Sequence, residues 1–295
     1  MSGENTHKFG FVSVVGGANV GKSTLVNALV GSKVCAVSPK PNTTRSRIRG
    51  VLTAADAQIA FTDTPGIVRA SGGMLKRMNA AALGAVGDGR TLVVTDAAHP
   101  FAKGEERAIE GSSRPVIVAL NKTDTVGEAE TFEAIGAAAR FGEKISDIVP
   151  VSALRERGLG RLLEVIKGAL PAGERMLPDK PSGDGAEMFT AAEFVREKVF
   201  RLTRGEVPYG CAVAVREMSR RKNGTVYIRA EVFVEKDGHR KIVIGKEGRM
   251  IKKIGSRARA DMEKFLDAKV FLDLKVVVKP GWSKDGRFLE EIYGV

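Results

Sequence analysis

The first half of the chain alternates short apolar runs, rich in β-branched residues, with segments whose apolar positions recur at helical spacing. The apolar runs predict strands at residues 9–15, 48–53, 58–62, 91–95, 116–120 and 147–151. The segments with helical spacing predict helices at residues 22–30, 74–86, 103–111, 128–141 and 159–170. This alternation is typical of βα units, so it predicts an α/β domain: a doubly wound, mostly parallel sheet with helices on both faces.

The second part of the chain has a different order of elements. Its pattern predicts a helix at 187–202, strands at 209–217 and 226–234 joined by an Asn-Gly turn, an apolar stretch at 242–244, a long helix at 249–266, a strand at 270–278 and a last segment at 281–293. Read as helix–strand–strand–helix–helix–strand, this order predicts a separate α+β unit. Because a proline- and glycine-rich stretch at 171–185 lies between the two parts, we predict domains at 1–172 and 187–295 and a linker at 173–186.

The segment between the first predicted strand and the first predicted helix reads Gly-Gly-Ala-Asn-Val-Gly-Lys-Ser. This is the pattern of a phosphate-binding loop, in the strand–loop–helix setting that such a loop requires. Its glycines let backbone N–H groups turn toward phosphates, Lys22 would bind the β- and γ-phosphates, and Ser23 would ligate Mg²⁺. A glycine-rich turn with a chance Lys-Ser is the alternative, and the flanking strand and helix disfavour it. The nucleotide-binding residues predicted here are Gly16, Gly17, Ala18, Asn19, Val20, Gly21, Lys22, Ser23 and Thr24.

Two further loops are suited to sensing a γ-phosphate. After the strand at 58–62 comes a loop in which Asp63 can hold a Mg²⁺-bound water and the Gly66 N–H can bond the γ-phosphate. Earlier in the chain, Thr44, or alternatively Thr43, can close over Mg²⁺ from a polar loop flanked by proline. We therefore predict that the loop after the strand at 58–62 binds nucleotide through Asp63, Thr64, Pro65 and Gly66. The residues predicted to act directly in hydrolysis are Lys22, Thr44, Asp63 and Gly66.

Guanine recognition is predicted where the strand at 116–120 ends. A carboxylate such as Asp124 can accept hydrogen bonds from both N1–H and N2–H₂ of guanine, a donor pair that adenine lacks. Lys122 can lie along the base and Asn121 can brace the phosphate-binding loop. By position alone, Ser152, Ala153 and Leu154, after the strand at 147–151, would offer a backbone N–H to guanine O6.

A Gly-Lys-Glu-Gly loop stands between helical segments of the second unit, inside the densest basic run, residues 239–259. This setting matches the loop with which a KH module clamps the backbone of about four single-stranded nucleotides, and the order of elements indicates the bacterial, type II arrangement of that module. Nearby Lys and Arg side chains would neutralise phosphates, and Ile244, Ile251 and Ile254 would line an apolar groove for the bases. The alternative is a helix–turn–helix with a solvated basic face. The predicted RNA-binding residues are Ile244, Gly245, Lys246, Glu247, Gly248, Arg249, Ile251 and Lys252.

The overall composition agrees with a nucleic-acid partner. A net charge of +12 and a pI near 9.8 favour nucleic acid or an anionic membrane as partner. No uninterrupted apolar stretch approaches the roughly 18–20 residues needed to cross a bilayer, and residues 1–8 lack the apolar core of a signal peptide. Cys35 and Cys211 are far apart without Cys-x-x-Cys spacing, so neither a disulfide framework nor a zinc site is indicated. These features predict a soluble protein of the reducing cytoplasm.

The nucleotide motifs, in this order, resemble the guanine-nucleotide domain of the translation-factor-like GTPases. The runs Asn-Val-Gly-Lys-Ser-Thr-Leu, Asn-Thr-Thr-Arg and Asp-Thr-Pro-Gly are similar to the branch with the Era, TrmE and Der families, although Ala18 stands where that branch usually has proline. With the KH-like second half, including Pro208-Tyr209 and Gly281-Trp282, the chain resembles the Era family over nearly its whole length. The linker departs from the usual Pro-Glu/Asp-Asp start of that family.

This resemblance implies a GTP-hydrolysing protein, with GTP or GDP and Mg²⁺ as cofactors, that binds near the 3′ end of small-subunit ribosomal RNA and acts in 30S subunit assembly. We expect a monomer in which GTP orders residues 43–49 and 63–74 and so changes the RNA groove. The resemblance makes Asn19 a candidate K⁺ ligand, against the alternative that its amide braces the loop around Thr44. Ile67 stands where Ras-type proteins have a water-orienting glutamine, which predicts slow intrinsic hydrolysis.

Two other functions stay open at this point. The first is a regulatory GTPase that is peripherally associated with the cytoplasmic face of the inner membrane, where its basic tail would contact anionic lipid. The second is an RNA chaperone whose nucleotide site does not turn over. The intact Lys22, Ser23 and Asp63 disfavour the second.

Overall fold

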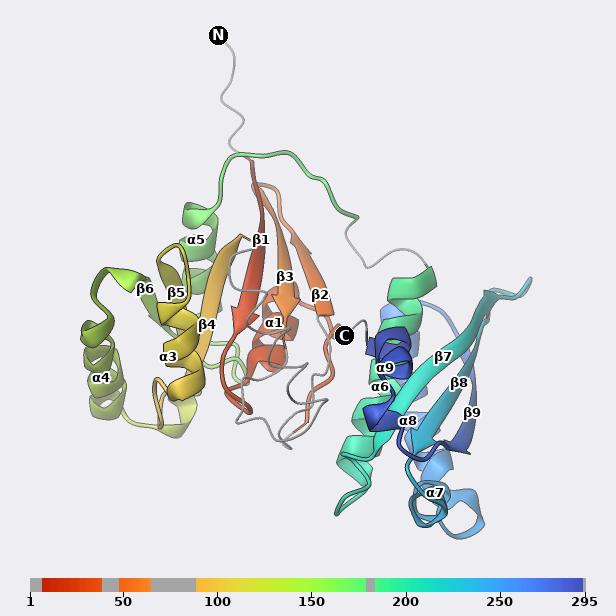
Figure 1. The fold of residues 1–295 in the computed structure, drawn as a ribbon. Helices are drawn as coiled ribbons and strands as arrows, with labels where there is room; N and C mark the ends of the chain where they lie inside the picture. The colour runs from red at the N-terminus through yellow and green to blue at the C-terminus, as the bar shows by residue number, and fades with distance from the viewer. Residues whose placement is uncertain (1–6, 39–47, 65–88, 179–183, 294–295) are drawn as a thin grey trace. The chain divides into compact units, whose positions relative to one another are not determined.

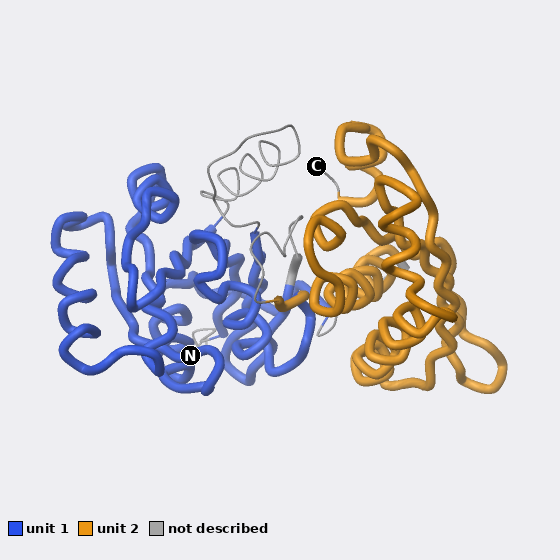
Figure 2. Tube along the Cα trace, turned by 90° about the horizontal axis from the view of Figure 1, so that it is seen from below, with its two compact units in different colours: residues 1–35, 44–181 blue, residues 36–43, 182–295 orange. Residues whose placement is uncertain are grey.

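The computed structural model describes residues 7–38, 48–64, 89–178 and 184–293. The chain divides into two compact units, coloured separately in Figure 2. Unit 1 comprises Met1–Cys35 and Thr44–Pro181, and unit 2 comprises Ala36–Thr43 and Ser182–Val295. No helix within the described ranges is long and apolar enough to span a membrane.

Unit 1 is built on a six-stranded sheet with strand order β2-β3-β1-β4-β5-β6 (Figure 1). The strands are β1 (Lys8–Val15), β2 (Ile48–Thr53), β3 (Ala57–Asp63), β4 (Arg90–Asp96), β5 (Val116–Asn121) and β6 (Ile145–Pro150). β2 pairs antiparallel with β3, whereas every other neighbouring pair is parallel. The predicted mostly parallel sheet is therefore confirmed. All residues of β5 are buried, as expected for a central strand covered on both faces.

The helices of unit 1 cover both faces of this sheet. They are α1 (Lys22–Val30), α3 (Lys103–Glu110), α4 (Glu128–Gly136) and α5 (Leu159–Ala169), with short 3₁₀ segments η1 (Thr123–Thr125) and η2 (Ala137–Lys144). α1 packs beside α5. α3 and η2 share a core with β1, β4 and β5, in which Ala108 and Ile109 meet Val93 and Val118. Parallel strands joined by right-handed crossovers bring their carboxyl ends to one edge, so the loops after β1, β3, β5 and β6 gather there.

Unit 2 has a three-stranded sheet with order β7-β8-β9. Its elements are α6 (Asp184–Leu202), β7 (Cys211–Arg220), β8 (Val226–Val234), α7 (Asp237–Ile244), η3 (Lys246–Gly248), α8 (Arg249–Leu266), β9 (Val270–Val278), η4 (Trp282–Lys284) and α9 (Gly286–Tyr293). β7 and β8 are antiparallel, and β8 and β9 are parallel. Alternate residues of β8 pack with α6 and α8 in one apolar core. On the other sheet face, Phe288 of α9 covers Phe233 of β8, with ring centroids 4.9 Å apart.

Several elements differ from the sequence prediction in extent. The predicted helix at 128–141 changes to a 3₁₀ segment after Gly136, and Gly142 has non-helical backbone angles. The sequence analysis predicted only an apolar stretch at 242–244 in this region. The structure has a helix, α7, that begins at Asp237, because a polar first turn precedes the apolar stretch. β7 runs to Arg220, three residues beyond the predicted end at 217, because pairing with β8 extends it. The predicted helix at 74–86 lies outside the described residues.

The segment after α5 is attached to unit 1 by the side chain of Gln58. The Gln58 Oε1 accepts hydrogen bonds from the backbone N–H groups of Met176 and Leu177, both at 2.9 Å. Its Nε2 donates to the carbonyl of Leu177 at 2.7 Å. Gln58 is fully buried, and its side-chain amide supplies this stretch with the hydrogen bonds that a neighbouring strand would otherwise make. The first part of the predicted linker is thus held to β3.

Candidate functional sites

The loop between β1 and α1 has a backbone that only glycine can supply at two positions. A Cβ on Gly16 would lie 2.3 Å from the carbonyl oxygen of Val94, and a Cβ on Gly21 would lie 2.3 Å from Nδ2 of Asn121. Gly21 also has φ 98° and is the N-cap of α1. The loop therefore packs closely against β4 and the end of β5. Its N–H groups lie at the start of a helix, which is the arrangement that binds phosphate.

Lys22 is buried under this loop. Its ammonium donates to the carbonyls of Gly16 at 3.2 Å and Gly17 at 2.7 Å. Burial lowers the pKa of Lys22, and the nearby carboxylates of Asp63 and Glu105 oppose that shift. A buried cation beside a ring of backbone N–H groups supplies concentrated positive charge for an anionic ligand.

The two predicted Mg²⁺ ligands of the described chain lie in contact. The Ser23 hydroxyl donates to Oδ2 of Asp63 at 2.6 Å, across 40 residues of sequence. Asp63 is fully buried at the end of β3, and the next residue, Thr64, donates its hydroxyl to the carbonyl of Val14 at 2.8 Å. A hydroxyl and a carboxylate fit a hard cation that takes oxygen ligands and also uses phosphate oxygens. Thr43, Thr44, Pro65, Gly66 and Ile67 lie outside the described residues.

Asn121 joins three of the predicted motifs. Its Nδ2 donates to the carbonyl of Val20 at 2.8 Å, and its Oδ1 accepts from the N–H of Ala153 at 2.9 Å. The side chain is 2% exposed. One buried amide thus links the phosphate loop to the loops after β5 and β6, because its donor and acceptor face opposite neighbours.

The residues predicted to recognise the base are also held in place by neighbours. Oδ1 of Asp124 accepts from the Ser152 hydroxyl at 2.5 Å, and Nζ of Lys122 pairs with Asp96 at 2.6 Å. The N–H of Ser152 donates to the carbonyl of Arg157, so this amide, like that of Ala153, has a partner within the chain. Leu154 is 74% exposed. The predicted contact of one of these amides with guanine O6 stays a prediction.

In unit 2, the Gly-Lys-Glu-Gly loop links α7 to α8 through three residues with positive φ. Gly245 and Gly248 have φ 73° and 72°, and Glu247 between them has φ 53°. A Cβ on Gly245 would lie 2.7 Å from Cβ of Met250, so the turn requires glycine there. Lys246 is exposed, whereas Arg249 forms an ion pair with Glu247 at 2.8 Å.

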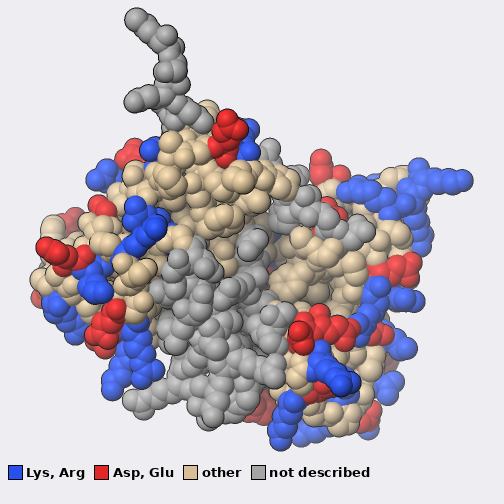
Figure 3. Space-filling model, turned by 45° about the horizontal axis from the view of Figure 1, so that its top comes forward, with Lys and Arg blue, Asp and Glu red and all other residues tan. Residues whose placement is uncertain are grey.

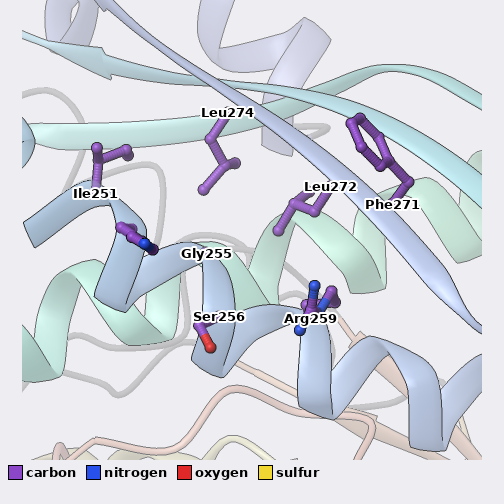
Figure 4. A pocket seen from close by; sticks show the side chains of 8 residues that line it. Ile251, Gly255, Ser256, Arg259, Phe271, Leu272 and Leu274 are labelled. Carbon is purple, nitrogen blue, oxygen red and sulfur yellow. The ribbon is translucent and has the colours of Figure 1, made fainter. Parts of the chain in front are cut away.

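A cavity of about 380 Å³ runs between α8 and β9, next to this loop (Figure 4). Its lining combines an apolar surface with the cationic side chains of Lys252 and Arg259. The lining residues are Ile251, Lys252, Gly255, Ser256, Arg259, Phe271, Leu272 and Leu274. Apolar and cationic groups along one groove fit the bases and phosphates of a single strand.

Family models match both units of the chain. A model described as 50S ribosome-binding GTPase matches residues 11–122, and a KH domain model matches residues 206–283. The GTPase Era of Halothermothrix orenii is 44% identical over 95% of this chain and 97% of that protein. The GTPase Era of Thermotoga maritima is 44% identical over 97% of both chains. This chain belongs to the Era family of GTPases.

Solved Era structures have the same fold over nearly the whole of both chains. A crystal structure of Era in complex with MgGDPNP and nucleotides 1506–1542 of 16S ribosomal RNA has a TM-score of 0.89 and 35% identity, and covers 98% of this chain and 99% of that chain. An alanine variant of Aquifex aeolicus Era bound to GDP·AlF₄⁻ also has a TM-score of 0.89 and 35% identity, over 97% and 99%. The predicted P-loop GTPase domain followed by a KH domain is thereby confirmed.

One buried residue of this Era-family site was missed by the sequence analysis. Glu105 of α3 is 1% exposed, and its Oε1 accepts from the N–H of Gly17 at 3.0 Å. Its Oε2 accepts from the Thr95 hydroxyl at 3.1 Å and from the Ala102 N–H at 2.6 Å. Burial raises the pKa of this carboxyl, while the hydrogen bonds from Gly17 and Ala102 oppose the shift. Its position in the first turn of a helix indicates a capping role, but no local signal connects it with Gly17.

The groove of the KH domain also differs in part from its prediction. Ile251 and Lys252 line the cavity as expected, but Ile254 is fully buried in the core of unit 2 and is not a groove residue. The prediction for Ile254 is wrong because that side of α8 faces α6 and the sheet. Ile244 is half-buried and is absent from the cavity lining. The sequence analysis did not predict the other lining residues. Phe271, Leu272 and Leu274 belong to β9, which has no motif that marks it as a groove wall, and Gly255, Ser256 and Arg259 lie on α8 beyond the predicted loop region.

Proposed function

We propose that this Era-family GTPase is a switch protein that binds near the 3′ end of small-subunit ribosomal RNA and acts in assembly of that subunit. The observation that carries the proposal is the groove between α8 and β9, which places an apolar wall, Lys252 and Arg259 beside a glycine-hinged loop. An Era structure with the same fold over 98% of this chain was solved with MgGDPNP and 16S ribosomal RNA nucleotides 1506–1542. The chemistry of the groove and that complex point to the same class of ligand.

In the nucleotide site, the roles follow from position and charge. Lys22 and the backbone N–H groups of the phosphate loop bind the β- and γ-phosphates. The hydrogen bonds from the Lys22 ammonium to the carbonyls of Gly16 and Gly17 hold this positive charge at the loop. Ser23 and Asp63 would hold Mg²⁺, and the bound metal would supply positive charge for the γ-phosphate oxygens. Asn121 braces the loop, and Asp124 reads guanine while Ser152 orients its carboxylate.

The phosphate loop holds a further candidate ligand. Asn19 has φ 64°, a conformation that asparagine tolerates better than most residues, and its side chain is exposed. We propose that its amide oxygen binds K⁺, whose charge would replace that of an arginine finger.

In the KH domain, the Gly245–Gly248 loop lets the sugar–phosphate backbone approach closely. Lys246, Lys252 and Arg259 pair with phosphates, and Ile251, Leu272 and Leu274 contact bases. We also propose that the protein acts as a monomer. We place it in the cytoplasm, where small subunits assemble.

The experiment measures GTP turnover with and without a short single-stranded RNA from the 3′ end of small-subunit ribosomal RNA, in K⁺ and in Na⁺ buffer. We expect the RNA to change turnover, and we expect this response to disappear when Gly245 and Gly248 are replaced by Asp. Gly238→Asp is the matched control, since a Cβ at Gly238 meets no atom within 4 Å and lies outside the loop. Faster turnover in K⁺ than in Na⁺, lost in Asn19→Ala, would support the K⁺ site.

Binding measurements on the same proteins can reject each part of the proposal separately. Equal RNA affinity with GTP analogue, with GDP and without nucleotide would reject the coupling between the two sites, because linkage requires reciprocal effects. An RNA affinity that is unchanged by the Gly245→Asp and Gly248→Asp pair would reject the groove. Binding to anionic vesicles that RNA does not displace would favour the membrane-associated GTPase instead.

A further inference from the structure

The sheet of unit 2 exposes a pair of aromatic rings on the face that lies opposite α6 and α8. Tyr227 of β8 and Phe271 of β9 are register partners, and their rings stack with centroids 5.9 Å apart and planes at 18°. Phe271 is 54% exposed. α9 covers the other end of this face, where Phe288 meets Phe233, so it leaves the end with Tyr227 and Phe271 open. Single exposed apolar residues are ordinary, but here two rings lie nearly parallel and one of them is more than half exposed.

An arginine from the β7–β8 turn lies over both rings. The guanidinium carbon of Arg221 is 4.9 Å from the centroid of Tyr227 and 5.5 Å from that of Phe271. Arg221, Tyr227 and Phe271 are here called the hairpin platform. Cation–π contact orients the guanidinium, and aromatic and guanidinium planes are the groups on which unstacked bases pack in protein–RNA complexes.

The charge around the hairpin platform is unbalanced. Arg220, Arg221, Lys222 and Lys269 are exposed, and none has an ion-pair partner in the described part of the chain. Cations farther along the same face are paired, since Arg216 bonds Glu231 and Glu291 and Arg229 bonds Glu217. The acidic residues closest to Phe271 in the sequence are Asp267, which is exposed, and Asp273, whose carboxylate accepts a hydrogen bond from the Tyr227 hydroxyl at 3.5 Å. Lys and Arg gather at the projecting end of unit 2 in Figure 3. The excess positive charge complements a polyanion.

The hairpin platform is continuous with the groove. Phe271 and Leu272 both line the cavity, and their side chains lie on opposite sides of β9 in Figure 4. β9 is the last strand in the order β7-β8-β9. A nucleic-acid strand that leaves the groove at Phe271 therefore reaches the platform by crossing a single strand, a spacing of about 5 Å.

We propose that the hairpin platform binds unpaired nucleotides of the RNA directly next to the segment held in the groove. One base stacks on the exposed ring of Phe271, and the phosphates on either side of it pair with the cations of the β7–β8 turn and with Lys269. This inference rests on the proposed function, because the groove must hold RNA first. It adds base-stacking by a sheet face to a module whose loop clamps only the backbone.

The test compares a short RNA of about four nucleotides, the length that a Gly-x-x-Gly loop clamps, with the same RNA extended by three nucleotides at its 5′ or its 3′ end. The extension carries 2-aminopurine, whose fluorescence falls when it stacks. We expect one extended RNA to bind the full-length protein about 5- to 150-fold more tightly than the short RNA, which is the range for one stacked base, and to be quenched on binding. The extension should also steepen the salt dependence, by about 0.7 for each added phosphate contact.

The variants separate the platform from the groove. Arg221→Ser combined with Tyr227→Thr should lower affinity for the extended RNA and weaken the quenching, because the ring of Phe271 loses the two neighbours that it contacts. Short-RNA binding should stay unchanged, since neither Arg221 nor Tyr227 lines the groove. Arg221→Ser alone is a second variant, measured in the same way. Because Arg221 lies in an exposed turn, its replacement does not disturb the packing of the sheet. Lys275→Ala is the matched control, because it removes one exposed cation from β9 without altering the platform.

Three outcomes would overturn the inference. If neither extension raises affinity or quenches 2-aminopurine while the short RNA still binds, the platform proposal fails and the proposed function stands. If the Arg221→Ser and Tyr227→Thr variants keep the full gain, the cluster only stabilises the hairpin. If the short RNA does not bind at all, the proposed function fails, and the platform proposal fails with it.

Discussion

The nucleotide site of unit 1 and the groove of unit 2 hold their charged groups in opposite ways. In unit 1, Lys22 is 6% exposed and Asp63 is fully buried, and the side chains of the site already bond to one another or to the backbone. In unit 2, Lys246 and Lys252 are exposed beside an open cavity. Lys22 and Asp63 of the first site are thus buried and bonded within the chain, whereas the two lysines of the second are exposed to solvent.

This difference indicates how each site fails. A buried and preorganised charged group interacts strongly with its ligand, because its surroundings have a low polarity. Its removal should therefore cause a large loss of activity, and salt should have little effect on its interactions. Exposed cations act through phosphate neutralisation, so each contributes modestly and its effect falls with rising salt. The predictions below test this contrast, from the largest effect to the smallest.

The largest effect is expected from Lys22→Ala. Removal of this preorganised cation should lower the turnover number for GTP about 100- to 1,000-fold, as for loss of one electrostatic donor at a transition state. Steady-state GTP hydrolysis measures it, at low and high salt. Lys103→Ala, an exposed cation at the start of α3, is the control and should have no effect. A loss below about tenfold would show that the buried ammonium contributes little to turnover.

A smaller effect is expected from Asp124→Ala. Loss of the charged hydrogen bonds to the base should weaken GTP and GDP binding about 10- to 150-fold, with no change for ATP. Equilibrium titration with fluorescent nucleotides measures both affinities. Asp147→Ala removes an exposed carboxylate of β6 and should change neither. Ser152→Ala should weaken binding less, because Ser152 only orients Asp124. Equal losses of GTP and ATP binding would contradict the base-reading role.

In the groove, Lys252→Ala should reduce the slope of log affinity against log salt by about 0.7, the value for one phosphate contact with a single strand. Arg249→Ala should reduce it less, because Arg249 is paired with Glu247 before RNA binds. RNA titrations at several salt concentrations measure the slopes. Lys253→Ala is the matched control, since its neighbour lines the cavity and it does not. A salt-independent loss in Lys252→Ala would mean that the groove resembles the buried site.

The smallest effect is expected from Glu105→Gln and concerns pH. Burial raises the pKa of Glu105 above its ordinary value of 4.5, so the native chain keeps this proton to a higher pH than the unfolded chain does. The stability contributed by this group is therefore complete below pH 4.5 and falls as pH rises through the native pKa. Because glutamine does not titrate, wild-type stability relative to the variant should fall over that window. Thermal unfolding at several pH values measures this difference in stability, in the unfolding transition that GDP shifts. A difference between wild type and variant that does not change with pH would refute the raised pKa of Glu105.

The sequence alone determined the local chemistry of both sites. A Gly-x-x-x-x-Gly-Lys-Ser run between a strand and a helix predicts the phosphate loop, since its glycines let neighbouring backbone N–H groups turn toward a phosphate. The order of βα units places Asp63 and Asn121 at one sheet edge, because parallel strands share a direction. The Gly-x-x-Gly turn is likewise a local property of the Gly245–Gly248 backbone.

Only the tertiary structure decided which distant side chains meet. The contact between Glu105 and Gly17 spans 88 residues, and no local pattern specifies which helix end lies against the phosphate loop. Ile251 and Ile254 lie on the same helix, yet only the packing of α8 on the sheet makes one a groove residue and the other core. The pairing of Tyr227 with Phe271 follows from the parallel register of β8 and β9. Long-range packing is set by the whole apolar core, whereas turns and caps are set by their own few residues.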